Sequence, residues 1–406
     1  MTIQLDALLK DRYVANRFMN QINEATIALD NIEKTSKYVD FSGRQAKFPI
    51  QLSHPQGFGF AGATDDFPTA VDPTLTQGVV DMAWLKFAIK VEMELMERSK
   101  NDAGAFARGV GLQMDSIAPA MRRHVNFLIL NSNGAGNICY LTADATSTSH
   151  VVSDVTNLEV GMRVAAITRG ANADFSASST VVADTTITAI VPSTKTVTFA
   201  DSINAGDPAA AATTTWIFRY GEKGKVILGI PAALDGTIDT YLGVSRASYG
   251  SFNGVVNTTG TKPTTVAITE APLYIGDTVI NKTGINKKMY LASHELINGL
   301  AQTFGTLRQY NDAQAVNLKG GYRGLTFSDT SFFADEQMPG SMVYMLTPET
   351  WQIHQTGDLK WVEPTPGNIL QKPAGKSYWV GEGYWPFQVV CVRPNANVIN
   401  DNLKAS

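Results

Sequence analysis

The sequence has few of the features that mark secreted, membrane-spanning or metal-binding proteins. Its 406 residues include two cysteines, Cys139 and Cys391, which lie far apart and outside any CxxC motif. This spacing argues against a zinc site or a disulfide framework and predicts two buried thiols. No apolar run reaches the roughly 18 residues of a membrane span, and charged residues interrupt the N-terminal stretch where a signal peptide needs an apolar core. We therefore expect a cytoplasmic protein without a membrane span.

An excess of charge of one sign is also absent. The chain carries 33 Lys and Arg against 37 Asp and Glu, a net charge of −4, with no block of like charges. This charge balance argues against a protein that binds nucleic acid with its whole surface, although it is compatible with a local basic face. Arg108, Arg122 and Arg123 lie on one predicted helix, and two interpretations stay open. They form either an ordinary solvated helix face or a face near double-stranded DNA that meets phosphates without reading bases.

The sequence contains several partial matches to enzyme motifs, and each lacks a required feature. Gly57, Gly59 and Gly62 have the G-x-G-x-x-G spacing of a dinucleotide-binding loop. Two aspartates and a proline follow, however, where the motif needs the start of a helix that attracts a pyrophosphate. We interpret the stretch as the glycine-rich tip of a loop.

Two further motifs fail at one required position each. The Gly-Lys-Ser sequence at 375–377 follows Leu370, where a phosphate-binding loop needs glycine. The His-Glu pair at 294–295 is followed by Asn298 in place of the second histidine of a zinc protease, which favours an ordinary surface helix. No G-x-S-x-G elbow occurs, and no histidine has the spacing of a triad. We therefore predict no catalytic residue, no metal and no cofactor.

Hydrophobic periodicity divides the first third of the chain into three parts. Residues 4–33 show a loose helical spacing and form an arm before any recognisable domain. Two extended segments, 44–53 and 76–94, flank the glycine-rich tip and predict a long hairpin, in which Pro49 favours an edge position. From Asn101 a stripe of apolar residues three and four apart predicts a long helix, kinked at Pro119 and ended by the turn NSNGAGN.

Composition changes sharply between about residues 136 and 224. Short β-branched runs rich in Thr, Ser, Ala and Val alternate there with turn residues, which is typical of a small all-β module inserted into another fold. Beyond it, segments 271–284 and 289–305 are candidate helices. Segments 324–335 and 341–348 are candidate strands, and a strand pair is expected at 377–383 and 384–394. The whole chain is thus predicted to be α+β.

This order of parts resembles the major capsid proteins of tailed bacteriophages, which have the Hong Kong 97 capsid fold. Local strings add to the resemblance, which covers nearly the whole chain: NLEVGMRVAAI (157–167), VNLKGGYRGLTF (316–327), MPGSMVYMLTPETWQIH (338–354) and PFQVVCVRPNANVI (386–399). The resemblance implies an N-terminal arm, an extended loop called the E-loop, a peripheral domain built on a spine helix, an inserted all-β domain and an axial domain. The corresponding boundaries are 1–40 for the arm, 41–100 for the E-loop with its adjoining strand, 101–135 for the spine helix, 136–224 for the insertion, and 225–406 for the axial domain with the C-terminal peripheral strands.

The resemblance also implies a structural role in place of an enzymatic one. Such a subunit assembles with itself into hexamers and pentamers of an icosahedral head, in the virion, after synthesis in the host bacterial cytoplasm. Its implied partners are a portal, possible decoration proteins and packaged double-stranded DNA held by non-specific contact. The residues expected to contact neighbouring subunits are Gly57, Gly59 and Gly62 as hinges, Phe58, Phe60 and Phe67 as anchors, and Lys319 and Arg323 in a turn that could equally be an ordinary hairpin. Arg108, Arg122 and Arg123 are the candidates for proximity to DNA on the inner face.

Two departures and one alternative qualify the resemblance. Some relatives cross-link through an E-loop lysine, but Gln51 to Thr76 contains no lysine, so we expect no such bond. Only about 40 residues precede the E-loop, so we expect a separate scaffolding protein in place of a fused one. The alternative is an encapsulin-type compartment, which shares the fold and encloses enzymes in place of DNA.

Overall fold

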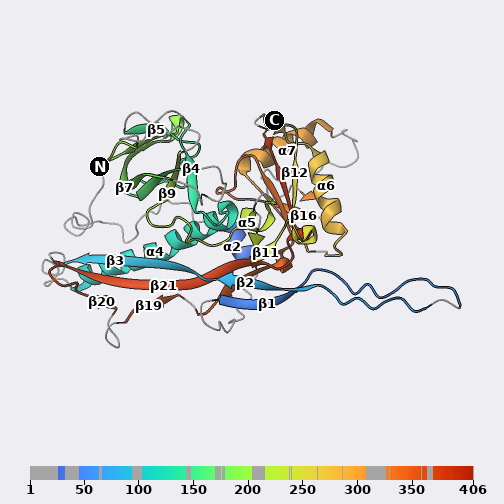
Figure 1. The fold of residues 1–406 in the computed structure, drawn as a ribbon. Coiled ribbons are helices and arrows are strands. Elements are labelled where there is room, and N and C mark those ends of the chain that lie inside the picture. The colour runs from blue at the N-terminus through green and yellow to red at the C-terminus, as the bar shows by residue number, and fades with distance from the viewer. Residues whose placement is uncertain are drawn as a thin grey trace.

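The computed structural model describes most of the chain as one set of layers. Its described residues are 26–32, 45–63, 66–93, 103–142, 148–169, 175, 179–203, 215–236, 238, 240–262, 264–285, 287–307, 326–328, 330–357, 359–363 and 369–405. Figure 1 shows a long, narrow platform with a helix running along it, two lobes above the platform and a hairpin that projects from one end.

The platform is built on one very long strand pair. Strand β21 (Tyr378–Cys391) pairs antiparallel with β3 (Ala83–Glu92), and on its other edge with β18 (Trp351–Gln355), β19 (Lys360–Trp361) and β20 (Leu370–Gln371). The expected strand pair at 377–383 and 384–394 was therefore wrong, because a single continuous strand covers both segments. Its two glycines do not mark a turn: a Cβ at Gly381 would lie 3.0 Å from Ile89, and one at Gly383 would lie 2.2 Å from Phe87. They leave room for side chains of β3.

The long predicted helix is α4 (Ala103–Asn131), which includes Pro119. Its expected caps, Asn101 and Asp102, lie outside the described residues. The last turns bury Val125 and the run Phe127–Leu130 in the main core. A short N-terminal helix, α2 (Ile27–Asn31), packs on α4 through Ala28 and Leu29.

The Thr-rich segment forms a six-stranded sheet with the order β4-β9-β6-β7-β8-β5. Its apolar residues alternate inward and form a core of their own, separate from the main core and including Val164, Ile187, Val197 and Ile217. The elements are β4 (Asn137–Tyr140), β5 (Ser149–Val151), β6 (Arg163–Thr168), β7 (Ser179–Val191), the 3-10 turn η1 (Pro192–Thr194), β8 (Thr196–Phe199) and β9 (Thr215–Arg219).

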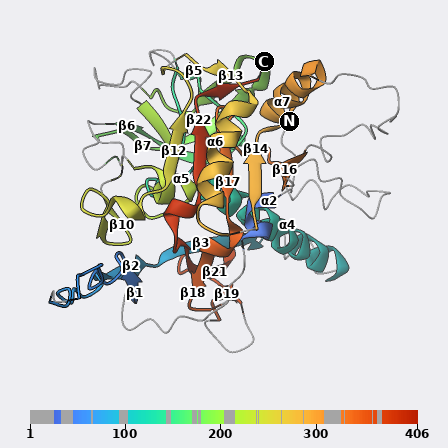
Figure 2. The ribbon, with the colours of Figure 1, turned by 90° about the vertical axis from the view of Figure 1, so that its right-hand side faces the viewer.

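The second lobe is a mixed sheet between two hydrophobic layers. Its order is β12-β22-β17-β14-β16-β15, with β12 (Val255–Thr258), β22 (Val398–Asp401), β17 (Val343–Leu346), β14 (Met289–Ala292), β16 (Thr330–Ala334) and β15 (Thr326–Phe327). Figure 2 shows α6 (Glu270–Asn281) lying across one face of this sheet. Tyr290 packs with α6 and with α7 (His294–Leu307), whereas its neighbour Leu291 faces the main core with α4. Segment 289–292 is thus a buried strand where part of a helix was expected, since all four of its side chains are buried and serve both faces.

Short elements connect these layers. They are α5 (Ile230–Leu234), β10 (Thr240–Tyr241), β11 (Val244–Ser245), η2 (Gly250–Phe252), β13 (Val266–Ala267), η4 (Pro348–Thr350), η5 (Pro394–Ala396) and β23 (Leu403–Lys404). Cys139 and Cys391 are free and buried, as predicted, and burial raises the pKa of the Cys391 thiol to about 12. Among the described residues no helix is long and apolar enough to cross a membrane, and no cluster of His, Cys, Asp or Glu could hold a metal ion.

Candidate inter-subunit surface

The projecting hairpin, residues 45–81, is the most exposed part of the described chain. Strand β1 (Gln45–Gln51) pairs antiparallel with β2 (Leu75–Asp81), and Pro49 lies opposite Gln77 in this two-stranded sheet, which provides the edge position that proline requires. Backbone pairing continues beyond the strands, where Leu52 N–H donates to the Thr74 carbonyl at 2.9 Å. At about 3.3 Å per residue, the stretch from Asp66 to the root at Asp81 spans roughly 50 Å. The tip therefore lies far from the rest of its own chain (Figure 1).

Three aromatic side chains at this tip face solvent. Phe58 is 76% exposed, and Phe60 and Phe67 are essentially fully exposed. Scattered apolar side chains are normal on a protein surface, but three phenylalanines on one thin projection are typical of a surface that another molecule covers. The structure thus places the three predicted anchors together on one tip.

The glycines of the tip do not have the backbone conformation that favours glycine over other residues. A Cβ at Gly57 would lie 3.1 Å from the Ala70 Cα, so the two arms of the hairpin approach each other closely there. Gly57, Gly59 and Gly62 do not belong to the described glycines with positive φ. Their role as hinges stays a prediction, since their backbone conformation is one that other residues also adopt.

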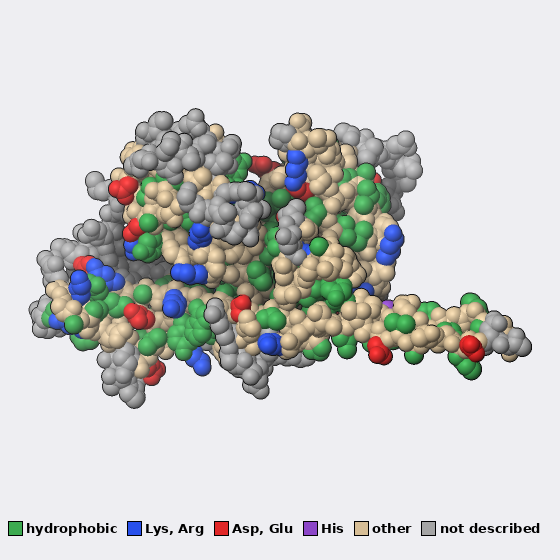
Figure 3. Space-filling view, viewed as in Figure 1, with side chains coloured by type: hydrophobic (Ala, Val, Ile, Leu, Met, Phe, Trp, Pro, Cys, Tyr) green, Lys and Arg blue, Asp and Glu red, His purple; other side chains and the backbone are tan. Residues whose placement is uncertain are grey.

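The projecting hairpin is also acidic. Between Lys47 and Lys86 the sequence has no Lys or Arg, whereas it has four aspartates. Figure 3 shows hydrophobic and acidic side chains along the projection. A partner surface should therefore combine apolar contact with positive charge.

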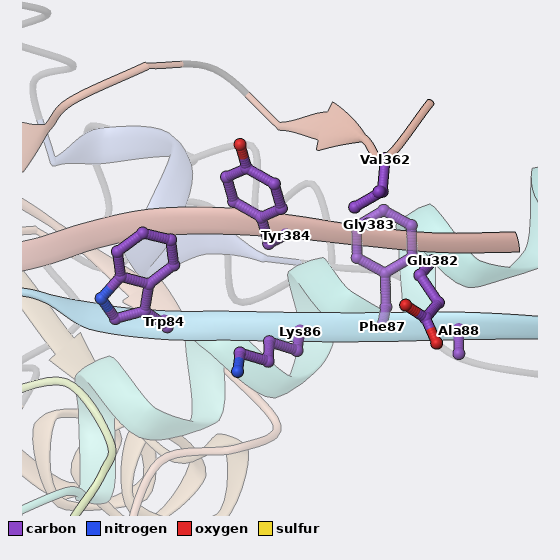
Figure 4. Close-up of a pocket in the computed structure, with 8 residues that line it drawn as sticks. All are labelled: Trp84, Lys86, Phe87, Ala88, Val362, Glu382, Gly383 and Tyr384. Carbon is purple, nitrogen blue, oxygen red and sulfur yellow. The ribbon is translucent and has the colours of Figure 1, made fainter. Parts of the chain in front are cut away.

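The platform carries a pocket that combines aromatic side chains with one cationic residue, Lys86, and one acidic residue, Glu382. Its volume is about 710 Å³, and it is lined by Trp84, Lys86, Phe87, Ala88, Val362, Glu382, Gly383 and Tyr384. Figure 4 shows Trp84 and Tyr384 side by side on neighbouring strands, with Lys86 beside them. The Trp84 and Tyr384 rings lie 5.6 Å apart, and 56% of the Trp84 residue is exposed.

Sequence reasoning did not identify this pocket. The alternating string AWLKFAIKVE in β3 marks Trp84 and Lys86 as residues of the same face. Tyr384 and Val362, however, come from the C-terminal quarter of the chain. Only the pairing of β3 with β21 brings these residues together.

The predicted basic residues are largely engaged within the chain. Arg122 pairs with Asp30 at 2.6 Å. Arg123 donates to the Thr156 carbonyl at 2.7 Å and pairs with Glu159 at 3.3 Å. The side chain of Arg108, and all of Lys319 and Arg323, lie outside the described residues.

Comparison with known proteins identifies the fold. No protein-family model matches the chain, and no curated protein matches it in sequence. Among solved structures, the chain is similar to the capsid asymmetric unit of cyanophage A-1(L), with a TM-score of 0.58 and 12% identity over 96% of this chain and 95% of that one. The capsid of a native GTA particle gives a TM-score of 0.51 and 10% identity over 98% and 95% of the two chains.

An encapsulin resembles the chain less closely. The holo-SrpI encapsulin of Synechococcus elongatus PCC 7942 gives a TM-score of 0.46 and 9% identity, over 100% of this chain and 97% of that one, too low to support a conclusion. The two similarities above 0.5 extend over almost the entire chain, so they concern the whole architecture and not one lobe. The protein therefore has the phage capsid-protein fold, the Hong Kong 97 fold that its sequence resembles.

Proposed function

We propose that this protein is the major capsid protein of a tailed phage, a structural subunit that assembles with itself into hexamers and pentamers of an icosahedral head. The observation that carries the proposal is the solvent-exposed phenylalanine tip at the end of a projection that its own body does not cover. An aromatic, acidic tip far from any surface of its own chain needs a surface on another molecule. A second copy of the chain offers one, the platform pocket with Trp84, Tyr384 and Lys86.

The contact between tip and pocket is heterologous. One copy contributes the tip and the other contributes the pocket, so each copy can bind one neighbour through its tip and a second neighbour through its pocket. Such head-to-tail contacts close into rings when the rotation between copies fits an integral number of subunits. Rings of six and five copies are the capsomers of an icosahedral shell, which is the assembly that the proposal requires.

The remaining partners follow from the same proposal. A separate scaffolding protein, a portal and decoration proteins would act during or after shell assembly in the host cytoplasm, and the finished subunit would belong to the virion. DNA would be held by non-specific contact. Because Arg122 and Arg123 already bind carboxylates and a carbonyl, they would offer phosphates only their remaining N–H groups.

The decisive experiment is sedimentation of the chain expressed alone and together with neighbouring genes, followed by electron microscopy of the fast fraction. We expect closed shells of uniform size in at least one of the two preparations. A chain that stays monomeric in both would contradict the proposal. Enclosed cargo separates it from the encapsulin alternative, because DNA with a portal supports a phage head and a packaged enzyme supports a compartment.

A charge exchange tests which surfaces meet. Lys86→Asp places an acidic group at the pocket, and we expect it to reduce shell yield because it faces an acidic tip. Adding Asp66→Lys to the same chain should restore part of the yield. Lys195→Asp, on the exposed turn beside η1, is the matched control and should assemble normally. No rescue by the second substitution would exclude this pairing of surfaces.

A further inference from the structure

The root of the projecting hairpin meets a second, much smaller hairpin. Strands β10 and β11 pair Tyr241 with Val244, which leaves Leu242 and Gly243 as its two-residue turn. Val79 N–H, in β2, donates a hydrogen bond of 2.8 Å to the Leu242 carbonyl. We call residues 240–245 the root hairpin.

This hydrogen bond reaches the outer edge of β2. In an antiparallel pair the N–H groups of successive residues point alternately toward and away from the partner strand. Because the Val79 N–H points to the root hairpin, those of Gly78 and Val80 point toward β1. The exchange of the Val79 amide with solvent therefore reports the contact with the root hairpin, and that of its neighbours reports the pairing of β1 with β2.

The turn of the root hairpin has an unusual backbone conformation. Both of its residues have positive φ, 52° for Leu242 and 79° for Gly243. This is the left-handed geometry of the tightest hairpin turns, which glycine adopts readily and leucine rarely. The Leu242 side chain is buried in the main core, and this burial opposes the cost of its backbone conformation.

One buried arginine holds the root hairpin against the body. Arg246 directly follows β11 and is 2% exposed. Its guanidinium donates to the carbonyls of Ala232 at 2.8 Å and Ala233 at 2.5 Å, at the end of α5, and also to that of Asp235. It lies 5.1 Å from the centre of the Tyr241 ring. A planar group with five N–H donors can bind several carbonyls at once, which a lysine cannot do in the same geometry.

A second link fixes the same hairpin to the platform. The Tyr241 hydroxyl accepts a hydrogen bond of 2.9 Å from the Cys391 N–H, at the end of β21. The root hairpin is therefore joined to α5 through Arg246 and to the platform through Tyr241. The projecting hairpin therefore contacts the root hairpin, which is itself bound to the body through Arg246 and through Tyr241.

We propose that the root hairpin is a stop that fixes the direction in which the projecting hairpin leaves the body, and that Arg246 is the residue that positions this stop. The consequence for shell geometry rests on the proposed function, since the direction of the projection would decide where its tip meets a second copy. The stop itself can be tested on the unassembled chain. Its failure is therefore distinguishable from a failure of the proposed function.

The first test is hydrogen exchange resolved to single amides. Gly243→Val places a β-branched residue at φ 79°, where it is strained, and Arg246→Lys removes the bond to several carbonyls. We expect exchange of the Val79 amide to become at least about tenfold faster in both variants, with little change at Gly78 and Val80. Gly250→Val is the matched control, since a Cβ at Gly250 meets nothing within 4 Å. Unchanged exchange at Val79, or equal acceleration at all three amides, would overturn the proposal.

The second test measures the direction of the projection. Nitroxide labels at Ala61→Cys on the tip and Thr278→Cys on α6 give one distance by pulsed electron paramagnetic resonance, because both native cysteines are buried. We expect a narrow distance distribution in the parent chain and in Gly250→Val, and a broad or shifted one in Gly243→Val and Arg246→Lys. If Arg246→Lys does not fold, Gly243→Val decides, since residue 243 is exposed and its Cβ meets Val79 only at an ordinary contact distance of 3.5 Å. A distribution that stays narrow and unshifted in a folded Gly243→Val chain would show that the root hairpin is not a stop.

Discussion

Gly383 lies beneath the ring of Phe87, where β21 and β3, the two longest strands of the platform, pair antiparallel. Gly383 is the direct partner of Phe87 in the register of β21 and β3, and a Cβ on Gly383 would lie 2.2 Å from the ring atom Cζ. The same ring meets Trp361 edge to face, with 4.8 Å between the ring centres. The phenylalanine therefore occupies the space that a side chain at 383 would need.

Gly383→Ala should destabilise the platform. The added methyl group forces Phe87 out of its position, and such overpacking costs about 1–3 kcal/mol. We expect the free energy of unfolding in denaturant to fall by that amount. Gly340→Ala, where a Cβ meets nothing within 4 Å, is the control and should leave it nearly unchanged. Equal stability of the two variants would show that Phe87 moves aside without cost.

Removing the aromatic tip should separate assembly from folding. The variant Phe58→Ser, Phe60→Ser, Phe67→Ser removes three exposed rings that add nothing to the core of their own chain. We expect an unchanged melting temperature of the unassembled chain and a loss of most shells in sedimentation. Val191→Ser, an exposed apolar residue at the end of β7, should assemble like the parent chain. Normal shells from the triple variant would mean that the tip is not an anchor.

The buried carboxylate of Asp277 should make stability depend on pH. Burial raises the pKa of this group, but hydrogen bonds from Lys288, Tyr290 and Ser328 lower it by more, so the pKa lies below its usual value. A depressed pKa in the folded chain stabilises it above the unfolded pKa, and this contribution is lost as the pH falls through the folded pKa.

The substitution Asp277→Asn tests that contribution. Near pH 7 it leaves the Lys288 ammonium buried without its 2.5 Å partner, and breaking such a pair costs about 3 kcal/mol. The difference in unfolding free energy between parent and variant should stay constant from pH 7 to about pH 5. It should shrink as the pH falls further, because the unfolded carboxylate is protonated near its pKa of about 3.9 and the folded one at a lower pH. The exposed Asp201→Asn should show no such pattern. A difference that stays constant below about pH 5 as well would contradict the assigned role.

Mature particles should contain no covalent links made through a lysine in the stretch Gln51–Thr76 of the projecting hairpin. This stretch has no lysine to form an isopeptide bond. We expect a single band at the mass of one chain when mature particles are run on a denaturing gel. A ladder of covalent multimers would refute the prediction.

Local sequence patterns predicted those elements that a single segment can specify. The apolar spacing after Asn101 predicted the helix that α4 confirms, and extended segments around a glycine-rich tip predicted the pairing of β1 with β2. The prediction of two buried thiols was also confirmed. In each case the prediction came from the periodicity or spacing of residues in the sequence. This pattern indicates which side chains of a segment are buried.

The tertiary structure decided whatever depends on pairing between distant segments. The two segments predicted as a strand pair form one strand, in which Gly383 leaves room for Phe87. The buried run 289–292 became a strand because layers pack on both of its faces. The aromatic pocket likewise joins residues that lie far apart in the chain, and the hydrogen bonds of Arg246 join separate short elements. The sequence pattern of a segment shows which of its faces is apolar. The partner of that face is determined by pairing between segments that lie far apart in the chain, so no single segment specifies it.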